Sequence, residues 1–398
     1  MAKAKVLIVA PQPFYQDRGT PIAIKNLCQA LSSFDIRVTL LCLLEGEDIP
    51  LPRNVTIVRA KYPKIFFNLR PGFSIKKVFA DLYILKEIMH LAERDTFDIV
   101  VAVEEIAIFV ALFLGEKINL VVDMDSDIVE QMINSNFLWS PLRSLLEKIY
   151  SIPFRKCLAT IAVSKELCFK AIKHGALQAY LLEDCGENLP ECCVPKELRE
   201  NFEGFKVIVY VGNFERYQGL DLLLEGFKEY LNLNVVPTKL VLIGGIPEHI
   251  VFYRKKAKDL GLGEHCVFTG QKKSSELLPY LSLADCFVSP RTHGVNTPMK
   301  IYTYLSTAKP IVATNIVSHT QVLTHSTAFL VQPEPKEFAK GLMLALTSSD
   351  AQAKAQAGFK MFQERYSKTA FTKKTGEIFA EILNMVSLSR SVTCCNQA

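Results

Sequence analysis

Long apolar runs are scarce in this chain of 398 residues, and tryptophan occurs once, at Trp139. The longest apolar run, Ile106 to Leu114, is far shorter than the roughly 20 residues of a membrane-spanning helix. The opening residues, MAKAKVLIVAP, hold too short an apolar run for a signal peptide and instead predict a first buried strand. We therefore expect a cytoplasmic protein that is not exported, either soluble or attached to the inner face of a membrane.

Signs of a metal site and of a nucleic-acid surface are also missing. The 11 cysteines include no CxxC pair, and the adjacent pairs Cys192–Cys193 and Cys394–Cys395 lack ligand spacing. Several others lie in apolar, strand-like runs, which predicts reduced and mostly buried thiols. The formal net charge of +5 is small and dispersed, and no nucleic-acid-binding motif is present. We expect no metal ligands, no cofactor and no nucleic-acid partner.

What the chain does have is an alternation of β-branched runs and helical patterns in both halves. This alternation is typical of parallel sheets with crossover helices, and the length predicts two such domains. The fold class predicted is therefore α/β, with two doubly wound, Rossmann-like domains. The strands expected are Val6–Ala10, Arg37–Leu44, Asn54–Arg59, Asp98–Val103, Asn119–Asp123, Ala159–Val163, Lys206–Val211, Lys239–Ile243, Cys266–Thr269, Cys286–Ser289, Ile311–Thr314 and Ala328–Val331.

The boundary between the domains is predicted where prolines, glycines and charges interrupt the apolar periodicity, between Asp184 and Gly204. We expect an N-terminal domain over 1–185, a linker over 186–204 and a C-terminal domain over 205–367. A final helix is expected over 368–390, followed by a disordered polar tail at 391–398.

The segment SPRTHGVNTPMKIYTYLSTAKPIVAT, which begins at Ser289, suggests a ligand site. Asn296 or Thr297 can cap a helix whose first residue is Pro298. The free N–H groups of such a helix start and its dipole suit an anionic group such as a phosphate or diphosphate. Two basic side chains lie close by in the sequence, Arg291 and Lys300. An ordinary connecting loop between a strand and a capped helix explains the same residues equally well.

Two further loops follow predicted strands in the same way. After the first strand, Thr20 can cap a helix that starts at Pro21, and Gly19 lets backbone approach a ligand. After the first strand of the second half, Gly212 and Gly219 bracket a polar loop. Its polar residues are Asn213, Glu215, Arg216 and Gln218. Because ligands of such sheets bind at the carboxyl ends of the strands, three loops of this kind favour a shared cleft over coincidence.

The order and spacing of these motifs resemble family 4 glycosyltransferases of the two-domain GT-B type. The matching segments are DRGTPIAI, YVGNFERYQGLDLLLEG, LVLIGG, VFTGQKKSSELLPYLSLADCFVSPR and NTPMKIYTYLSTAKPIVATNIVSHTQVL. Within that family the chain is most similar to a branch with an SPR…NTPxKIYxYL pattern. The resemblance implies two domains facing a central cleft, with the acceptor held by the first and the donor mainly by the second. It also implies a retaining, metal-independent transfer of a hexosyl group from a nucleotide sugar, and a C-terminal helix that crosses back to the first domain.

The resemblance also assigns roles to the loops. Backbone N–H groups near Gly19 and at Thr297 and Pro298 would hold the donor diphosphate, replacing a metal with fixed dipoles. The nucleobase would lie against the loops at Gly245 and Gly270. The complete set of donor-binding residues predicted is Gly19, Thr20, Gly212, Asn213, Arg216, Gln218, Gly245, Gly270, Arg291, Asn296, Thr297, Pro298, Met299, Lys300 and Thr303.

Several positions depart from the family pattern. Asn213 and Gln218 stand where many members have an arginine and a lysine, so Arg216, Arg291 or Lys300 would supply the charge. Val295 and Thr303 stand where members have two glutamates, and a hydroxyl binds the donor ribose more weakly than a carboxylate. Asp125 stands where a histidine is common. We expect Asp125 and Glu105 to act near the reacting sugar, although Asp125 also fits a plain strand-end turn.

The acceptor side of the first half carries two segments that suit a bilayer surface. KYPKIFFNLRPGFSIKKVFADLYILK mixes basic and aromatic residues, and FLWSPLRSLLEKIYSIPFRK contains Trp139. Amphipathic helix packing explains both segments as well. Expected partners are a UDP- or GDP-sugar and a glycan or lipid-linked acceptor in polysaccharide or cell-envelope synthesis, with peripheral membrane contact.

Two other functions remain open from the sequence. One is a nucleotide-sugar-binding or scaffold protein that kept the fold and lost turnover, which the altered positions favour and the intact NTPMK and DRGTP loops oppose. The other is a GT-B epimerase or phosphorylase. The phosphorylase needs pyridoxal phosphate, for which the chain shows no convincing lysine motif.

Overall fold

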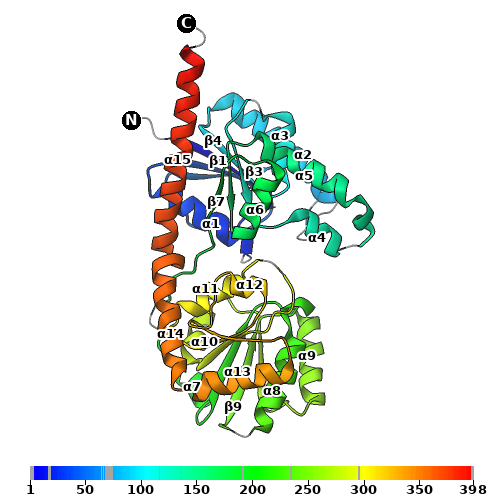
Figure 1. Cartoon of the computed structure of the whole chain (residues 1–398), viewed down its shortest axis with the longest axis vertical. Helices are drawn as coiled ribbons and strands as arrows, with labels where there is room; N and C mark the ends of the chain where they lie inside the picture. Colours follow the sequence, from blue (N-terminus) through cyan, green and yellow to red (C-terminus); the bar gives the residue numbers. More distant parts are fainter. Residues whose placement is uncertain are drawn as a thin grey trace. The chain divides into compact units, whose positions relative to one another are not determined.

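The computed structural model describes residues 4–16, 19–63, 65, 67, 75–115, 117–135, 137–190, 192–233, 235–294 and 296–395. Contacts divide the chain into a first unit, Met1–Asp184 with Thr369–Ala398, and a second unit, Cys185–Lys368. Each unit is a parallel sheet with helices on both faces (Figure 1). The prediction of two Rossmann-like α/β domains is therefore confirmed.

The first unit contains seven strands in the order β3-β2-β1-β4-β5-β6-β7. These are β1 (Lys5–Pro13), β2 (Arg37–Leu43), β3 (Val55–Ala60), β4 (Ile99–Val103), β5 (Leu120–Met124), β6 (Ala159–Ala162) and β7 (Ala179–Leu181). The strand β1 runs beyond its predicted end, and β7 was not predicted because its three residues carry no periodic signal. The other strands of this sheet lie within one residue of their predicted ends.

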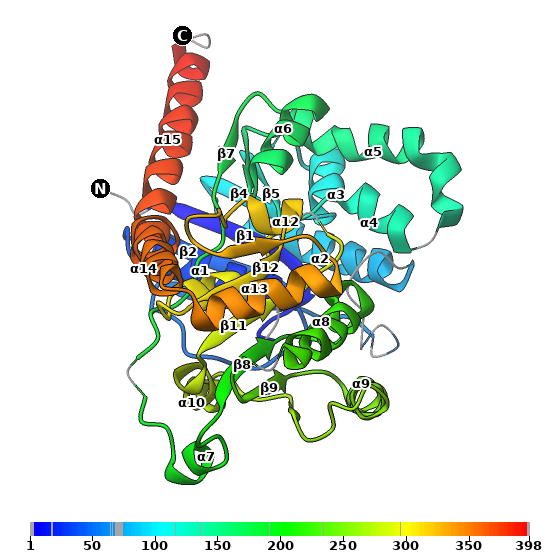
Figure 2. The same ribbon diagram turned by 60° about the horizontal axis from the view of Figure 1, so that its bottom comes forward.

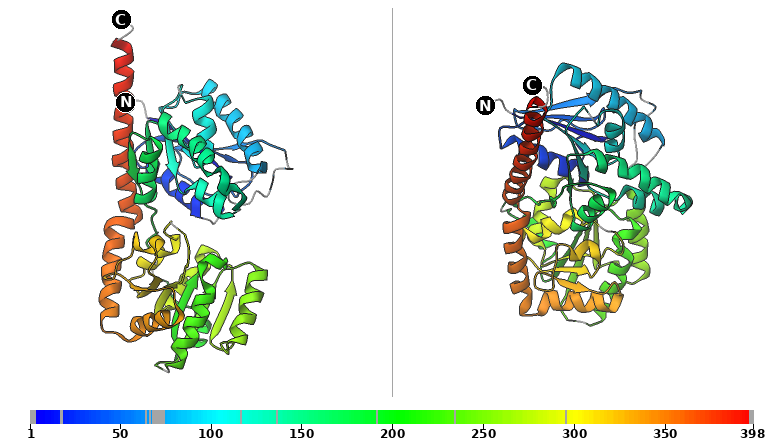
Figure 3. Two further views of the ribbon diagram at one scale, coloured as in Figure 1. Left: turned by 45° about the vertical axis from the view of Figure 1, so that its right-hand side comes forward. Right: turned by 45° about the horizontal axis from the view of Figure 1, so that its top comes forward.

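Helices cover both faces of this sheet (Figure 3). They are α1 (Gly19–Ser32), α2 (Ile75–Arg94), α3 (Ile106–Phe113), α4 (Ile128–Ser135), the 3-10 turn η2 (Phe137–Leu142), α5 (Arg143–Lys156), α6 (Lys165–His174) and α15 (Lys368–Cys395). Leu7 and Val9 of β1 share a core with α2 to α6, while the buried Val6 and Ile8 point to the opposite face. Burial of β1 on both faces explains why its sequence is a continuous apolar run.

The second unit contains six strands in the order β10-β9-β8-β11-β12-β13. These are β8 (Lys206–Val211), β9 (Thr238–Ile243), β10 (Cys266–Gly270), β11 (Cys286–Ser289), β12 (Ile311–Thr314) and β13 (Phe329–Val331). All six were predicted, with ends that agree to within one residue. The order reverses between β8 and β11, which places a topological switch point where their carboxyl ends diverge.

Helices of the second unit also lie on both faces. They are α7 (Lys196–Glu200), the 3-10 turn η3 (Arg216–Gln218), α8 (Leu220–Asn232), α9 (Pro247–Asp259), α10 (Ser274–Leu283), α11 (Met299–Leu305), α12 (Val317–Thr320), α13 (Pro335–Thr347), α14 (Asp350–Met361) and the π-helical turn η4 (Phe362–Tyr366). Ile208 and Tyr210 pack in one core with α8, α9 and α13, where α13 runs beside α8 (Figure 2). Val207 and Val209 pack in a second core with α10, α11 and η4.

Two predicted segments differ from the structure. Residues 186–204, expected to be a linker, belong to the second unit: α7 forms there, and Phe202 is buried in a core of that unit. Residues 391–395, expected to be a disordered tail, continue α15 to Cys395. Within the first unit, α15 packs closely against Phe34, since a Cβ atom at Gly376 would lie 2.2 Å from its ring.

The helices that the structure describes include none with the length and hydropathy needed to cross a membrane. Of the two segments predicted to suit a bilayer, the first lies partly outside the described residues, at 64, 66 and 68–74. Within its described part, Phe67 packs against the ring of Tyr62 and the core of the first unit. In the second segment, Trp139 is half-buried and packs against the same core.

Candidate active site

Glycines line the carboxyl ends of three neighbouring strands in the second unit. Gly212 follows β8, Gly244 and Gly245 follow β9, and Gly270 ends β10. A Cβ atom on Gly244 would lie 2.1 Å from the carbonyl oxygen of Gly212, so only glycine fits there. Backbone hydrogen bonds of 3.0 Å from Gly212 to Ile243 and 2.8 Å from Gly244 to Gly270 hold the three turns together. These four residues, which we call the glycine surface, present backbone that a ligand can approach closely.

Lys300 extends from α11 to the edge of this glycine surface. Its Nζ atom donates to Oε1 of Gln218 at 3.1 Å and lies 4.0 Å from the ring centroid of Tyr210. A Cβ atom on Gly212 would be only 3.0 Å from that Nζ. Burial, together with the charge of Arg291, lowers the pKa of Lys300 well below its usual range. Across the described ranges no carboxylate lies within ion-pair distance of Lys300, so an anionic ligand would be a favourable partner.

Arg291, predicted to supply positive charge to the donor diphosphate, lies near Lys300 and is held by carbonyls of its own loop. Its Nε donates to the carbonyl of His293 at 2.7 Å and its Nη1 to that of Asn296 at 2.8 Å, while the guanidinium lies 5.1 Å from the ring centroid of Tyr217. The side chain therefore closes its own loop. Arg291 therefore contributes positive charge near Lys300, while its Nε and Nη1 donors are already used by backbone carbonyls.

The predicted helix caps are corrected by the structure. The helix α11 begins at Met299, with Pro298 in the N-cap position and no side-chain cap from Thr297 or Asn296. In the first unit the helical residues begin at Gly19, and the Thr20 side chain hydrogen-bonds Asp125 instead of capping the helix.

The remaining predicted donor-binding residues are spread around the loop after β8 and along α11. Asn213 is exposed and its carbonyl accepts from the Tyr210 hydroxyl at 2.7 Å, while Arg216 is exposed in η3. Thr303 is half-buried and its carbonyl accepts from Ser306 at 2.8 Å. Met299 packs against the core of the second unit, so its role there is packing. Val295, a departure from the family pattern, lies outside the described residues.

The buried side chain of His319, which was not predicted to belong to the site, supports the loop that contains Arg291. Nε2 of His319 lies 2.8 Å from the Ser289 hydroxyl, and Nδ1 lies 3.0 Å from the Thr314 hydroxyl. Thr314 in turn donates to the carbonyl of Arg291 at 2.5 Å. His319 thereby joins the ends of β11 and β12 to the loop that precedes Lys300. Burial lowers the pKa of His319 to about 4.

This shift predicts a pH dependence of stability. Because the folded state disfavours protonated His319, the unfolded chain binds more protons between about pH 4 and pH 6.5, and stability falls as the pH is lowered through that window. We expect His319 to account for a loss of about 3 kcal/mol between pH 7 and pH 4. Urea unfolding of the wild type and His319→Gln at both pH values measures it. The exposed His325→Gln variant of the same unit is the control, and an equal pH dependence in wild type and His319→Gln would contradict the assignment.

The first unit gathers carboxylates at the ends of β4, β5 and β7. We call Glu104, Asp123, Asp125 and Asp184 the carboxylate strip. Glu104 accepts from Gln12 at 3.3 Å and from the Ser126 hydroxyl at 3.1 Å. Burial, with the neighbouring carboxylates, raises the pKa of Asp123 to about 7, and burial alone raises that of Asp184 to about 7. The same two causes raise the pKa of Asp125 well above its usual range. Asp123 and Asp184 therefore titrate near neutral pH.

Glu105, predicted to be catalytic, does not join this strip. It forms an ion pair with Lys77 of α2, whereas its neighbour Glu104 hydrogen-bonds Ser126 and Gln12. The reason is the backbone: Glu104 adopts a left-handed conformation with φ of 56°, which turns the chain sharply between β4 and α3. The sequence shows two adjacent glutamates and cannot tell which of them faces Asp125.

The cysteines at 28, 42, 157, 168, 185, 192, 193, 266 and 286 form no disulfide bonds, and most of these nine are buried. No cluster of histidine, cysteine, aspartate and glutamate with the geometry of a metal site occurs in the described part of the chain.

Two parallel-sheet Rossmann-like units in one chain define the GT-B class of fold. Solved structures of that class align along nearly the whole chain. Sucrose-phosphate synthase from Thermosynechococcus elongatus has a TM-score of 0.77 at 16% identity and covers 96% of this chain and 100% of its own. Anabaena HepE in complex with UDP-glucose has a TM-score of 0.72 at 14% identity, covering 95% and 99%. At such identities the likeness establishes the fold.

The family-model match lies in the second unit. Residues 205–348 match the family model described as Glycosyl transferases group 1. A GDP-mannose-dependent alpha-(1-6)-phosphatidylinositol monomannoside mannosyltransferase from Mycolicibacterium smegmatis is 35% identical over 89 residues, which cover 22% of this chain. The match spans 23% of the length of that mannosyltransferase. The glycine surface and Lys300 both lie inside the segment that matches the family model.

Proposed function

We propose that this protein is a glycosyltransferase that moves a hexosyl group from a nucleotide-sugar donor to a glycan or lipid-linked acceptor. The observation that carries the proposal is Lys300. It is a half-buried cation without a carboxylate partner among the described residues, beside the glycine surface and within the segment that matches group 1 glycosyl transferases. A half-buried cation without a carboxylate partner, next to backbone that a ligand can approach closely, suits a diphosphate.

In this proposal the second unit binds the donor. Lys300 neutralises the leaving diphosphate. Arg291, held by the carbonyls of His293 and Asn296, adds positive potential. The nucleobase lies against Gly245 and Gly270, and Gln218 orients Lys300 through its 3.1 Å hydrogen bond. Because these fixed charges and dipoles stabilise the leaving group, we propose that transfer needs no metal. We further propose family 4 membership and retention of the anomeric configuration, following the motif resemblance.

The first unit would then bind the acceptor along the carboxylate strip. Asp125 would orient the attacking hydroxyl, and its hydrogen bond to Thr20 would hold the carboxylate in place. The leaving phosphate can accept the hydroxyl proton, so the strip need not act as a strong base. We propose that the protein works in the cytoplasm at the inner face of a membrane, in polysaccharide or cell-envelope synthesis.

A binding protein without turnover is the second candidate. The specific observation in its favour is Thr303, an uncharged, half-buried residue where related enzymes have a ribose-binding glutamate. A site with Lys300 but without that carboxylate would bind the diphosphate and hold the sugar loosely.

One experiment separates these candidates. The purified protein is incubated with a panel of UDP- and GDP-sugars, with and without EDTA, and thermal shift and slow donor hydrolysis are both recorded. We expect one donor to raise the melting temperature and to be hydrolysed equally in EDTA, because Lys300 replaces a metal. Stabilisation without hydrolysis, also in the presence of candidate acceptors, would favour the binding protein. No response to any donor would remove the basis of the proposed function.

A further inference from the structure

A cavity of about 230 Å³ lies within the first unit, among α2, α3, α4 and α5. Its walls are almost wholly apolar, with side chains from all four helices and from η2. They include Val78, Ile108, Val129, Met132, Trp139 and Ile149. Protein interiors rarely leave a void of this size unfilled, and an apolar cavity of about 150 Å³ is already large enough to hold benzene. The cavity therefore has room for a hydrocarbon group.

Three acidic or basic residues are found among the residues that line the cavity. Lys77 and Glu105 form an ion pair there, and Asp81 lies one helical turn beyond Lys77 on α2. Asp81 is 1% exposed, and its Oδ1 has no hydrogen-bond partner within the described residues. A buried carboxyl oxygen without a partner is costly, so a ligand that hydrogen-bonds it would be stabilised.

The chemistry of Asp81 narrows the class of ligand. Burial and the nearby Glu105 raise the pKa of the Asp81 carboxyl well above its usual range. A hydroxyl group can donate to the ionised form and accept from the protonated form. An ether or a plain hydrocarbon cannot do both.

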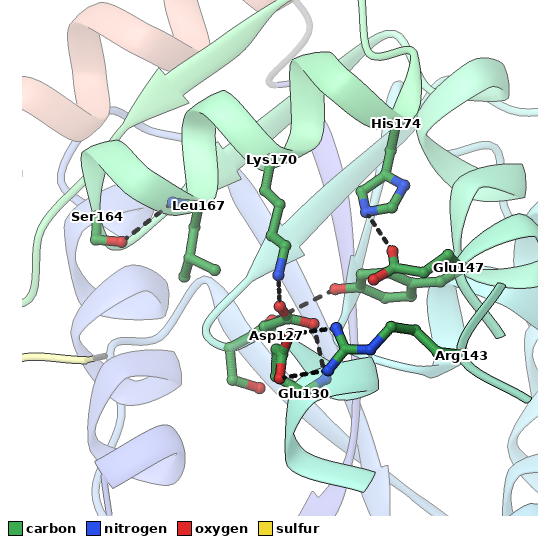
Figure 4. Close-up of polar contacts among 10 residues, drawn as sticks. Asp127, Glu130, Arg143, Glu147, Ser164, Leu167, Lys170 and His174 are labelled. Carbon is green, nitrogen blue, oxygen red and sulfur yellow. Dashed lines mark hydrogen bonds and ion pairs between the residues drawn. The ribbon is translucent and has the colours of Figure 1, made fainter. Parts of the chain in front are cut away.

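Polar contacts join α4, α5 and α6, two of which line the cavity (Figure 4). Arg143 of α5 donates from Nη1 and Nη2 to the two carboxylate oxygens of Glu130 in α4, at 2.5 and 3.2 Å. Lys170 of α6 forms an ion pair with Asp127, just before α4. His174 lies 3.2 Å from Glu147. These contacts link α4, α5 and α6 beside the cavity.

The lining of the cavity also lies near the carboxylate strip. Tyr150 lines the cavity and donates to the carbonyl of Ser126 at 3.3 Å, and the hydroxyl of Ser126 donates to Glu104. Lys77 interacts electrostatically with both Glu105 and Glu104. An amphiphile in the cavity would therefore have its polar end nearest to the strip.

We propose that this cavity binds the hydrocarbon chain of a hydroxyl-bearing amphiphile, with the hydroxyl at Asp81. The cavity lies in the first unit and the proposed donor site in the second, so occupation of the cavity does not require the proposed transferase activity. Two sources share this chemistry: the lipid part of an acceptor, and a membrane lipid that is held without being modified. The acceptor source rests on the proposed function, whereas the binding itself does not.

The test uses 1-octanol as the probe on the full chain without any donor. We expect 1-octanol to raise the melting temperature and to give a saturable calorimetric isotherm. Val129→Phe should fill the cavity, keep the melting temperature of the unliganded protein and abolish the octanol response. Val317→Phe, at an exposed position of the second unit, is the matched control and should leave the response unchanged.

Two more variants complete the test. The first fills the cavity at a more exposed position, in case Val129→Phe does not fold, and the second removes the proposed hydroxyl partner. Ile149→Trp, at a position 39% exposed on the cavity wall, should fold and also block octanol. Asp81→Leu should weaken octanol binding about tenfold or more by removing the hydroxyl partner. The proposal is overturned if 1-octanol produces no saturable response, if both filling variants bind it as the wild type does, or if Asp81→Leu leaves its affinity unchanged.

The sources are then separated in the presence of a donor. If octanol competes with transfer to a lipid-linked acceptor, the cavity holds the acceptor chain; if transfer is unaffected while octanol binds, it holds a structural lipid. Failure of the transferase assay with intact octanol binding would count against the proposed function alone.

Discussion

Replacing Lys300 by methionine is expected to lower kcat/KM for the nucleotide sugar by about 10² to 10³-fold, because one fixed positive charge at the leaving diphosphate is lost. The donor-induced rise in melting temperature should disappear with it. The unliganded protein should be at least as stable as the wild type, since methionine removes a half-buried charge that has no carboxylate partner among the described residues. Donor binding by the wild type should weaken as the pH rises, below the pH at which an ordinary lysine titrates.

Lys309 provides a matched control in the same unit. Burial lowers its pKa too, but its Nζ donates to the carbonyls of Leu281, Ser282 and Ala284 at 3.1, 2.5 and 2.6 Å. Lys309→Met should therefore lose about 1 to 3 kcal/mol of stability and keep its donor affinity. The opposite pattern, with Lys300→Met unstable and still active, would show that Lys300 is structural.

Replacing Asp125 by asparagine is expected to lower kcat by about 10² to 10⁴-fold, because the acceptor hydroxyl loses the carboxylate that orients it. The donor-induced thermal shift should remain, since the residues proposed to bind the donor lie in the second unit. Single-turnover transfer and donor thermal shift, measured on the same preparation, check both statements.

The control for this variant is Asp127, two residues further along the chain. Its Oδ1 accepts from the backbone N–H of Glu130 and its Oδ2 pairs with Lys170, so it fixes the start of α4. Asp127→Ala should lose about 1 to 2 kcal/mol of stability with little change in kcat. If Asp125→Asn kept the wild-type kcat, the carboxylate strip would have no part in the transfer step.

The candidate site shows where prediction from the sequence stops. Thr20 and Asp125 were assigned separately, and the structure joins them by a hydrogen bond. Lys300 was predicted alongside Arg291, yet only Lys300 reaches Gln218 and the glycine surface, because Arg291 is held by the carbonyls of His293 and Asn296. Neither outcome can be read from spacing, since both depend on how a loop closes on itself.

Other features gave no local signal at all. His319 is buried and lies within hydrogen-bond distance of Ser289 in β11 and Thr314 in β12. Ser289 is 30 residues away in the sequence and Thr314 is five residues away, and neither spacing marks a contact in the sequence. The cavity of the first unit arises from four helices that a sequence pattern describes one at a time. Glu104 and Glu105 are adjacent, but a single left-handed residue sends them into different surroundings.

The sequence by itself determined the two parallel sheets, nearly every strand, and the glycine- and proline-containing loops at their carboxyl ends. It did so because apolar periodicity and turn chemistry are local properties, which a run of a few residues such as Val6–Ala10 already carries. Only the tertiary structure decided where the polar and charged side chains lie: Lys300 beside Gln218, Glu104 rather than Glu105 in the carboxylate strip, and Asp81 at an apolar cavity. Those positions depend on side-chain direction and on contacts between segments distant in the chain, and no local pattern encodes either.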